Sequence, residues 1–226
     1  MPTDHFFRKI YMPILSFALV AFCVCNLLYA GIVSSAKRVD VNASFYFLVT
    51  EDTKTEAGAE FAKLEGGAGY LLEHEGVEYV TLAVYLEERE GLAVQKNLKQ
   101  EGKATSLLQK GASTLWFKGK ERAQSTFVVS GLNTLKSYIT ILKETLDSLD
   151  EGLPQERCKE LLNTQLRQYA YAKEYYKGYE ALSEVFDKSA QQLFAIVSDI
   201  VYVRDLRYLL CWQTENYLAL CSKFSI

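Results

Sequence analysis

Two consecutive stretches of this chain each combine a strand, a helix and a second strand, and this repetition limits its fold most strongly. The first stretch runs from Asn42 to Gly76, and the second runs from Val77 to Gly119. Apolar runs such as FYFLV and VEYVTLAVYL alternate with helix-forming segments such as TKTEAGAEFAKLEGG and EEREGLAVQKNLKQEG. The order β-α-β-β-α-β is the split βαβ, or ferredoxin-like, pattern, in which both helices pack on one face of an antiparallel sheet. We therefore expect an α+β domain over residues 42–119.

Local signals bound the elements of this domain. Thr53-Lys54-Thr55-Glu56 spells a capping box, which predicts that the first helix begins near Lys54, and Gly66-Gly67 supply its left-handed end. The spacing of Ala57, Phe61 and Leu64 predicts that these three residues form the buried stripe of that helix. A hairpin is expected at residues 73–76. An extra strand pair, 104–109 and 113–118 around Gly111, is expected to extend the sheet.

An uncharged N-terminal run predicts a membrane anchor. No residue from Ile10 to Ala36 is charged, and at about 1.5 Å per residue the run is long enough to cross a hydrocarbon core of ~30 Å. We expect a transmembrane helix over residues 10–33 after a cytoplasmic tail of residues 1–9. The alternative is a cleaved signal peptide, because small residues at 34–36 follow a basic start at Arg8 and Lys9. The run exceeds the roughly 7–15 apolar residues of a signal peptide, which favours the anchor.

Residues 120–226 have the pattern of a helical domain. Apolar residues recur there at alternating intervals of four and three, at Val128, Leu132, Leu135, Ile139, Leu142, Leu146, Leu149 and Leu153. Gly152 and Pro154 end this helix and begin the next. A further break is expected at Gly178 or at residues 187–189, because one helix over the remaining length would be too long for this protein. The simplest architecture is an antiparallel three-helix bundle.

Composition argues against several classes of function. A formal net charge of -3, with no block of Lys and Arg, argues against a nucleic-acid partner. The five cysteines form no metal-binding pattern, so we expect buried, reduced thiols and no metal. Phosphate-loop, nucleophile-elbow and metalloprotease motifs are missing, and the carboxylate pairs at 51–52 and 73–75 lie where capping and turns favour acidic residues. We therefore expect neither an enzyme nor a cofactor.

Two groups of polar or aromatic residues in the helical half have structural interpretations. Eight tyrosines lie between residues 169 and 217, and the spacing of Tyr169, Tyr176 and Tyr179 fits helix packing better than sugar stacking. Arg204 and Arg207 flank Asp205, which is typical of a solvated face of ion pairs that contributes little to stability.

His74 falls at a hairpin tip with no second metal ligand nearby in the sequence.

Residues 45–119 resemble a SPOR (sporulation-related repeat) domain, the small peptidoglycan-binding module of bacterial envelope proteins. The resemblance rests on the aromatic first strand Phe45–Val49, on the helix that follows Thr50-Glu51-Asp52, and on the second aromatic strand Tyr79–Tyr85. It implies a single-pass protein of the bacterial cell membrane whose C-terminal part is extracytoplasmic. Its implied function is the binding of peptidoglycan glycan strands in cell division or sporulation.

The resemblance also implies where glycan would bind, namely on the sheet face that the helices leave open. Alternation along the strands places Tyr46, Leu48, Val80 and Leu82 on that face. Three of these positions depart from the family pattern, because Leu48, Val80 and Leu82 are apolar where polar residues are usual. The strands are also apolar without interruption, which is typical of strands buried on both faces. The alternative is therefore a scaffold in which the C-terminal helices cover this face and the helical domain binds a protein partner.

Overall fold

A computed structural model describes residues 36–50 and 56–225, and the chain divides into two compact units. The smaller unit combines Met1–Arg38 with Trp116–Ser125. Among its described residues, the Arg38 guanidinium lies 5.9 Å from the centroid of the Trp116 ring, within the range of a cation–π contact. The larger unit combines Val39–Leu115 with Thr126–Ile226 and contains most of the sheet and of the helices.

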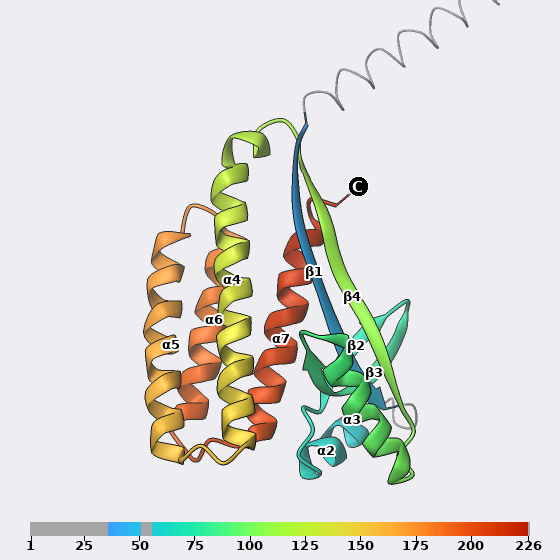
Figure 1. Ribbon diagram of the computed structural model, residues 1–226. Coiled ribbons are helices and arrows are strands. Elements are labelled where there is room, and N and C mark those ends of the chain that lie inside the picture. Colours follow the sequence, from blue (N-terminus) through green and yellow to red (C-terminus); the bar gives the residue numbers. More distant parts are fainter. Residues whose placement is uncertain (1–35, 51–55, 226) are drawn as a thin grey trace, which may run out of the picture. The chain divides into compact units, whose positions relative to one another are not determined.

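The predicted order of strands and helices in the first half is confirmed (Figure 1). The elements are β1 (Lys37–Thr50), α2 (Glu56–Leu64), β2 (Tyr70–His74), β3 (Val77–Tyr85), α3 (Glu88–Gln100) and β4 (Thr105–Phe117). The strands form one sheet in the order β2-β3-β1-β4, and β3 pairs antiparallel with both β2 and β1. The chain is therefore of the α+β class, as predicted.

The hairpin between β2 and β3 turns at Glu75 and Gly76. Their φ angles are 53° and 76°, so both residues are left-handed. Two consecutive left-handed residues make a type I′ turn, whose twist matches that of the flanking strands. The predicted hairpin is confirmed, and His74 is the last residue of β2.

The strand pair predicted around Gly111 is wrong, because β4 is a single strand that runs through this glycine. A Cβ atom at Gly111 would lie 2.6 Å from the Ala43 carbonyl oxygen. Glycine is thus required here by the close approach of β1 to β4, and a tight turn is not the reason for it.

The described residues 120–225 contain four helices and not the predicted three. They are α4 (Glu121–Asp150), α5 (Gln155–Tyr175), α6 (Glu180–Val197) and α7 (Val203–Ser222). The apolar repeat of α4 is buried from Val128 to Leu146, which confirms that prediction. Gly152 has a φ of 99°, and the Leu153 amide donates to the Ser148 carbonyl at 2.8 Å, which closes the predicted end of α4.

The unpredicted break between α6 and α7 contains neither glycine nor proline. It passes through Val201, whose backbone groups both bind the side-chain amide of Gln155 at the start of α5. The Gln155 Nε2 atom donates to the Val201 carbonyl at 2.9 Å, and the Val201 amide donates to the Gln155 Oε1 atom at 3.2 Å. This side chain satisfies backbone groups that a continuous helix would have paired internally, so a tertiary contact stabilises the break.

Helix α7 lies between the sheet and the other helices of the bundle (Figure 1). On the sheet side, the ring of Tyr217 packs edge-on against Phe45 of β1 at 5.7 Å between centroids. The Tyr70 hydroxyl of β2 donates to the Glu215 carboxylate, and Lys110 of β4 lies 3.6 Å from the same carboxylate. Burial and the Glu215 carboxylate together raise the pKa of Tyr70. One carboxylate of α7 thereby contacts both edge strands.

On the bundle side, α7 joins a buried polar network. The Tyr169 hydroxyl of α5 lies 3.1 Å from the Gln213 Oε1 atom and accepts a hydrogen bond of 3.0 Å from the Gln165 Nε2 atom. Tyr169 and Tyr176 are buried and Tyr179 is half-buried, so the prediction that these tyrosines pack in the core is confirmed for the first two. Burial raises the pKa of Tyr169, so this hydroxyl keeps its proton as a donor.

Several predictions fall on residues outside the described ranges. They are the cytoplasmic tail of residues 1–9, the transmembrane helix of residues 10–33, the capping box at Thr53, and Cys23 and Cys25. Within residues 36–50 and 56–225, no helix is both long enough and apolar enough to cross a membrane. The other three cysteines, Cys158, Cys211 and Cys221, are buried and free, as predicted.

Candidate functional site

The four residues predicted to bind glycan lie on the sheet face that α2 and α3 cover, so the predicted open face is wrong. Val80 is fully buried in a cluster with Ala59 and Ala62 of α2, and Leu82 packs against that cluster. Leu48 and Leu82 line a cavity that α2 and α3 also line. Tyr46 pairs in register with Tyr85, which lines the same cavity.

The opposite face is the one that α7 covers. It presents Phe45, whose ring meets Tyr217, and Phe47, whose ring lies 6.0 Å from the ammonium group of Lys110. Alternation along a strand separates two faces but does not tell which of them the helices cover, and this ambiguity is the reason for the error. A C-terminal helix does cover the sheet, but the prediction that it covers Tyr46, Leu48, Val80 and Leu82 is wrong, because α7 packs on the face that presents Phe45.

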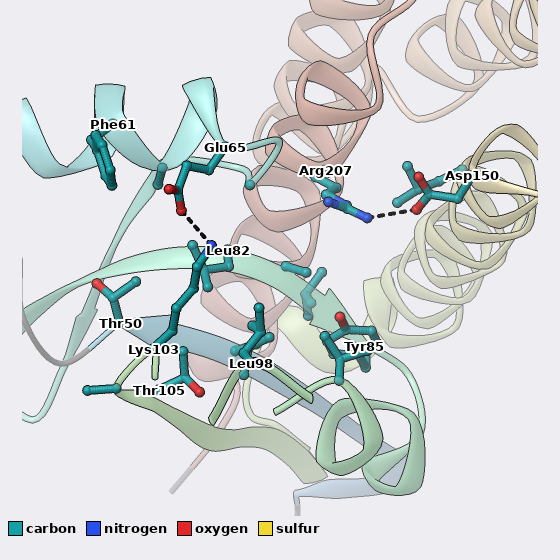
Figure 2. A pocket seen from close by; sticks show the side chains of 18 of the residues that line it. Thr50, Phe61, Glu65, Leu82, Tyr85, Leu98, Lys103, Thr105, Asp150 and Arg207 are labelled. Carbon is teal, nitrogen blue, oxygen red and sulfur yellow. Dashed lines mark hydrogen bonds and ion pairs between the residues drawn. The ribbon is translucent and has the colours of Figure 1, made fainter. Parts of the chain in front are cut away.

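The cavity between α2, α3 and the sheet is the best-defined site in the described part of the chain (Figure 2). Its volume is about 520 Å³. Its apolar walls are formed by Leu48, Phe61, Ala62, Leu82, Val94 and Leu98. Residues of α4 and α7 complete the cavity on one side. The site thus combines an apolar interior with elements from both halves of the larger unit.

Helix α2 packs on the sheet through small residues, and this packing leaves Phe61 beside the cavity. The buried residues of α2 are Gly58, Ala59 and Ala62, whereas Phe61 and Leu64 are 59% and 78% exposed. The predicted buried stripe of Ala57, Phe61 and Leu64 is therefore wrong. Small side chains let a helix approach a sheet closely, so the Gly-Ala stripe was the signal in the sequence for this orientation.

Ion pairs surround the cavity and tie its elements together. Lys103 binds Glu65 at 2.7 Å, which joins the end of α3 to the end of α2, as Figure 2 shows. The Arg207 Nη2 atom of α7 binds Asp150 at 2.7 Å, and its Nη1 atom donates to the Gly66 carbonyl at 2.7 Å. Arg207 was expected on a solvated face beside Asp205, but it holds α2, α4 and α7 together at the cavity.

The third cation of the cavity, Lys143 of α4, has two carboxylate partners. Its Nζ atom lies 2.7 Å from the Asp147 Oδ1 atom and 3.4 Å from Glu90 of α3. At the other end of the site, the hydrogen bond to Glu65 raises the pKa of Lys103, so Lys103 keeps its positive charge. In the described part of the chain, the three cations that line the cavity, Lys103, Lys143 and Arg207, are thus each paired with a carboxylate.

The side chains of Thr50, Thr105 and Tyr85 add hydroxyl groups to the apolar walls. Thr105 at the start of β4 is 1% exposed, and its Oγ1 atom has no hydrogen-bond partner among the described residues. Its carbonyl accepts a hydrogen bond of 2.8 Å from Gln95 of α3, which fixes the position of Thr105. Burial raises the pKa of Tyr85 to about 12, so its hydroxyl stays protonated at neutral pH.

The structure also bears on metal binding and on His74. In the described ranges, no group of three or more His, Cys, Asp or Glu side chains is placed to hold a metal ion. His74 is half-buried at the end of the hairpin strand.

Comparison with protein-family models, with curated proteins and with solved structures found no match to this chain. The resemblance to SPOR domains therefore stays a prediction.

Proposed function

We propose that this chain is a membrane-anchored, non-enzymatic binding protein whose ligand site is the cavity between α2 and α3. One observation carries the proposal, namely an apolar cavity of about 520 Å³ with a few polar groups. Small-molecule sites occupy about 300–1,000 Å³ and share this composition. The anchor is the uncharged run over residues 10–33.

The exposure of Phe61 supports a site that is completed by a ligand. This side chain lines the cavity and is 59% exposed. Moving a phenylalanine side chain fully out of water stabilises a protein or complex by about 1.5–3 kcal/mol. A ligand in the cavity would gain part of that free energy by covering the exposed part of the ring.

The pairing of the charged groups supports binding without catalysis. General acid–base chemistry needs a carboxylate or histidine within reach of a substrate, with a pKa matched to proton transfer. Three carboxylates of the described residues line the cavity, Glu65, Asp147 and Asp150, and each binds a cation of this chain. These charges bind α2, α3, α4 and α7 to one another and leave the apolar walls for the ligand.

Photoaffinity labelling tests this proposal. We expect a long-chain alkyl diazirine to label peptides that carry Phe61, Leu82 or Leu98 in the full chain held in lipid nanodiscs. Leu98→Trp places a larger ring in the cavity. A loss of ~1.4 kcal/mol of binding free energy would lower labelling at limiting probe about tenfold. Peptide mass spectrometry measures the labelled fraction.

The matched control is Leu92→Trp. Leu92 lies on the same helix, is 46% exposed and does not line the cavity. We expect this variant to be labelled as strongly as the wild type at the three cavity peptides. Equal labelling of Leu98→Trp and wild type at these peptides would contradict the proposal.

Binding of peptidoglycan is a second candidate, favoured by the order β-α-β-β-α-β and the strand order β2-β3-β1-β4. A glycan that used the sheet face opposite α2 and α3 would have to displace α7, which packs there through Tyr217 and Glu215. We therefore expect the full chain not to co-sediment with purified peptidoglycan. Co-sedimentation that survives Leu98→Trp would make glycan the ligand and contradict the cavity as the main site.

A further inference from the structure

We infer that the ligand of the cavity is an uncharged amphiphile, with an aliphatic body and a single hydroxyl or carbonyl head group. This inference rests on the proposed function, because it names the class of ligand for the same site. It follows from the charges and from the hydroxyl groups that line the cavity.

The charges that line the cavity are balanced and already paired. Among the described residues, three cations and three carboxylates lie there, and each cation has a carboxylate within 2.7 Å. A carboxylate or phosphate head group would have to compete for Lys103, Lys143 or Arg207. That competition would break an ion pair of the chain whose carboxylate is 41–47% exposed, and the affinity of an anionic ligand would be reduced by that loss.

A cationic head group would have to compete for a carboxylate that already has a partner. Glu65 and Asp150 are engaged by Lys103 and Arg207, and Arg207 is further held by the Gly66 carbonyl at 2.7 Å. The guanidinium also joins three helical segments, so releasing Asp150 would loosen the wall of the site. A head group without charge enters the cavity and breaks none of these pairs.

Three of the described residues that line the cavity carry hydroxyl groups, namely Thr50, Thr105 and Tyr85. The buried Oγ1 atom of Thr105 has no partner among the residues that the structure describes, and buried polar atoms usually have one. The hydroxyl of Tyr85 on β3 lines the same cavity and remains protonated. Both groups donate and accept hydrogen bonds, so they fit an alcohol, ester or amide oxygen.

A head-group series tests the inference with the full chain in nanodiscs. Three probes carry the same diazirine-bearing decyl chain and end in a hydroxyl, a carboxylate or a trimethylammonium group. We define site-specific labelling as the labelling that is lost in Leu98→Trp and retained in Leu92→Trp. We expect the alcohol to give at least about tenfold more site-specific labelling than either ion, at equal concentrations in the membrane.

The outcomes separate this inference from the proposed function. Equal or stronger site-specific labelling by the carboxylate or the ammonium probe overturns the uncharged ligand and leaves the cavity as a binding site. If none of the three probes gives labelling that Leu98→Trp removes, both the uncharged ligand and the cavity as a binding site are overturned. Labelling by the alcohol alone supports both.

Thr105→Val and Thr105→Ser then test the head-group contact. Valine has the shape of threonine and removes a buried hydroxyl that lacks a partner, so we expect this variant to fold. Its site-specific labelling by the alcohol should fall about three- to tenfold, as expected for one hydrogen bond. Labelling by a diazirine alkane without a head group should not change, and serine should restore the alcohol signal. If Thr105→Val lowers labelling by the alcohol and by the alkane equally, the Thr105 hydroxyl does not bind the head group. Its assigned role would then be overturned.

Discussion

Ile139→Asp should unfold the helical half of the larger unit or bring it close to unfolding. Ile139 lies in the middle of α4 with no exposed surface, within a continuous row of buried apolar residues. Aspartate at this position would put a carboxylate in an apolar core without a partner. We expect a loss of roughly 4 kcal/mol or more in the free energy of unfolding, which is a large part of the usual 5–15 kcal/mol. Urea denaturation followed by tryptophan fluorescence measures it.

Ile141→Asp is the matched control for this experiment. Ile141 lies two residues further along the same helix, and 37% of its side chain is exposed. A carboxylate here stays hydrated, so we expect a change of about 0.5 kcal/mol or less. Similar losses in the two variants would mean that the apolar repeat of α4 does not face the core of the bundle.

Phe45→Ala should lower the free energy of unfolding by about 3–5 kcal/mol, the usual range for a buried phenylalanine. Phe45 is 1% exposed, and its ring packs against Tyr217 of α7 at 5.7 Å. Alanine would remove this contact and leave a cavity between the sheet and α7. The midpoint of urea denaturation measures the loss. If the unfolding free energy of the variant depends on urea concentration with the same slope as that of the wild type, only stability has changed.

This second experiment also tests whether α7 covers the sheet in solution. If the face were open, Phe45 would be in contact with water, and its replacement by alanine would be close to neutral. Ser44→Ala is the control, because Ser44 is exposed on the same strand and its side chain points to the other face. A loss below about 1 kcal/mol in Phe45→Ala would show an open face and revive it as a surface for glycan.

The masking of the sheet bears on the two functions considered for this chain. A SPOR-like domain would offer the face opposite its helices, but here Tyr217 and Glu215 of α7 pack on that face. The cavity lies on the opposite face, between helices that pack through Gly58, Ala59 and Ala62. The scaffold hypothesis gains support for its masking step, while its protein partner stays a prediction.

The sequence by itself determined those features whose causes are local. Alternation between apolar strands and short helices predicted the order of elements from β1 to β4. The spacing of Val128 to Leu146 predicted the buried face of α4, because a helix of 3.6 residues per turn can place that set of side chains on one side only. The end of α4 followed from Gly152, since its left-handed backbone favours glycine.

Only the tertiary structure decided which neighbour each face contacts. Strand alternation separated Tyr46 and Leu48 from Phe45 and Phe47, but only the packing of the elements decided that Leu48 lines the cavity and that Phe45 meets Tyr217 of α7. The break at Val201 depends on the Gln155 side chain, 46 residues away in the chain. The cavity depends on Arg207 of α7 meeting Gly66 and Asp150. Contacts between residues so distant in sequence leave no local pattern, because their energy appears only once the elements have packed together.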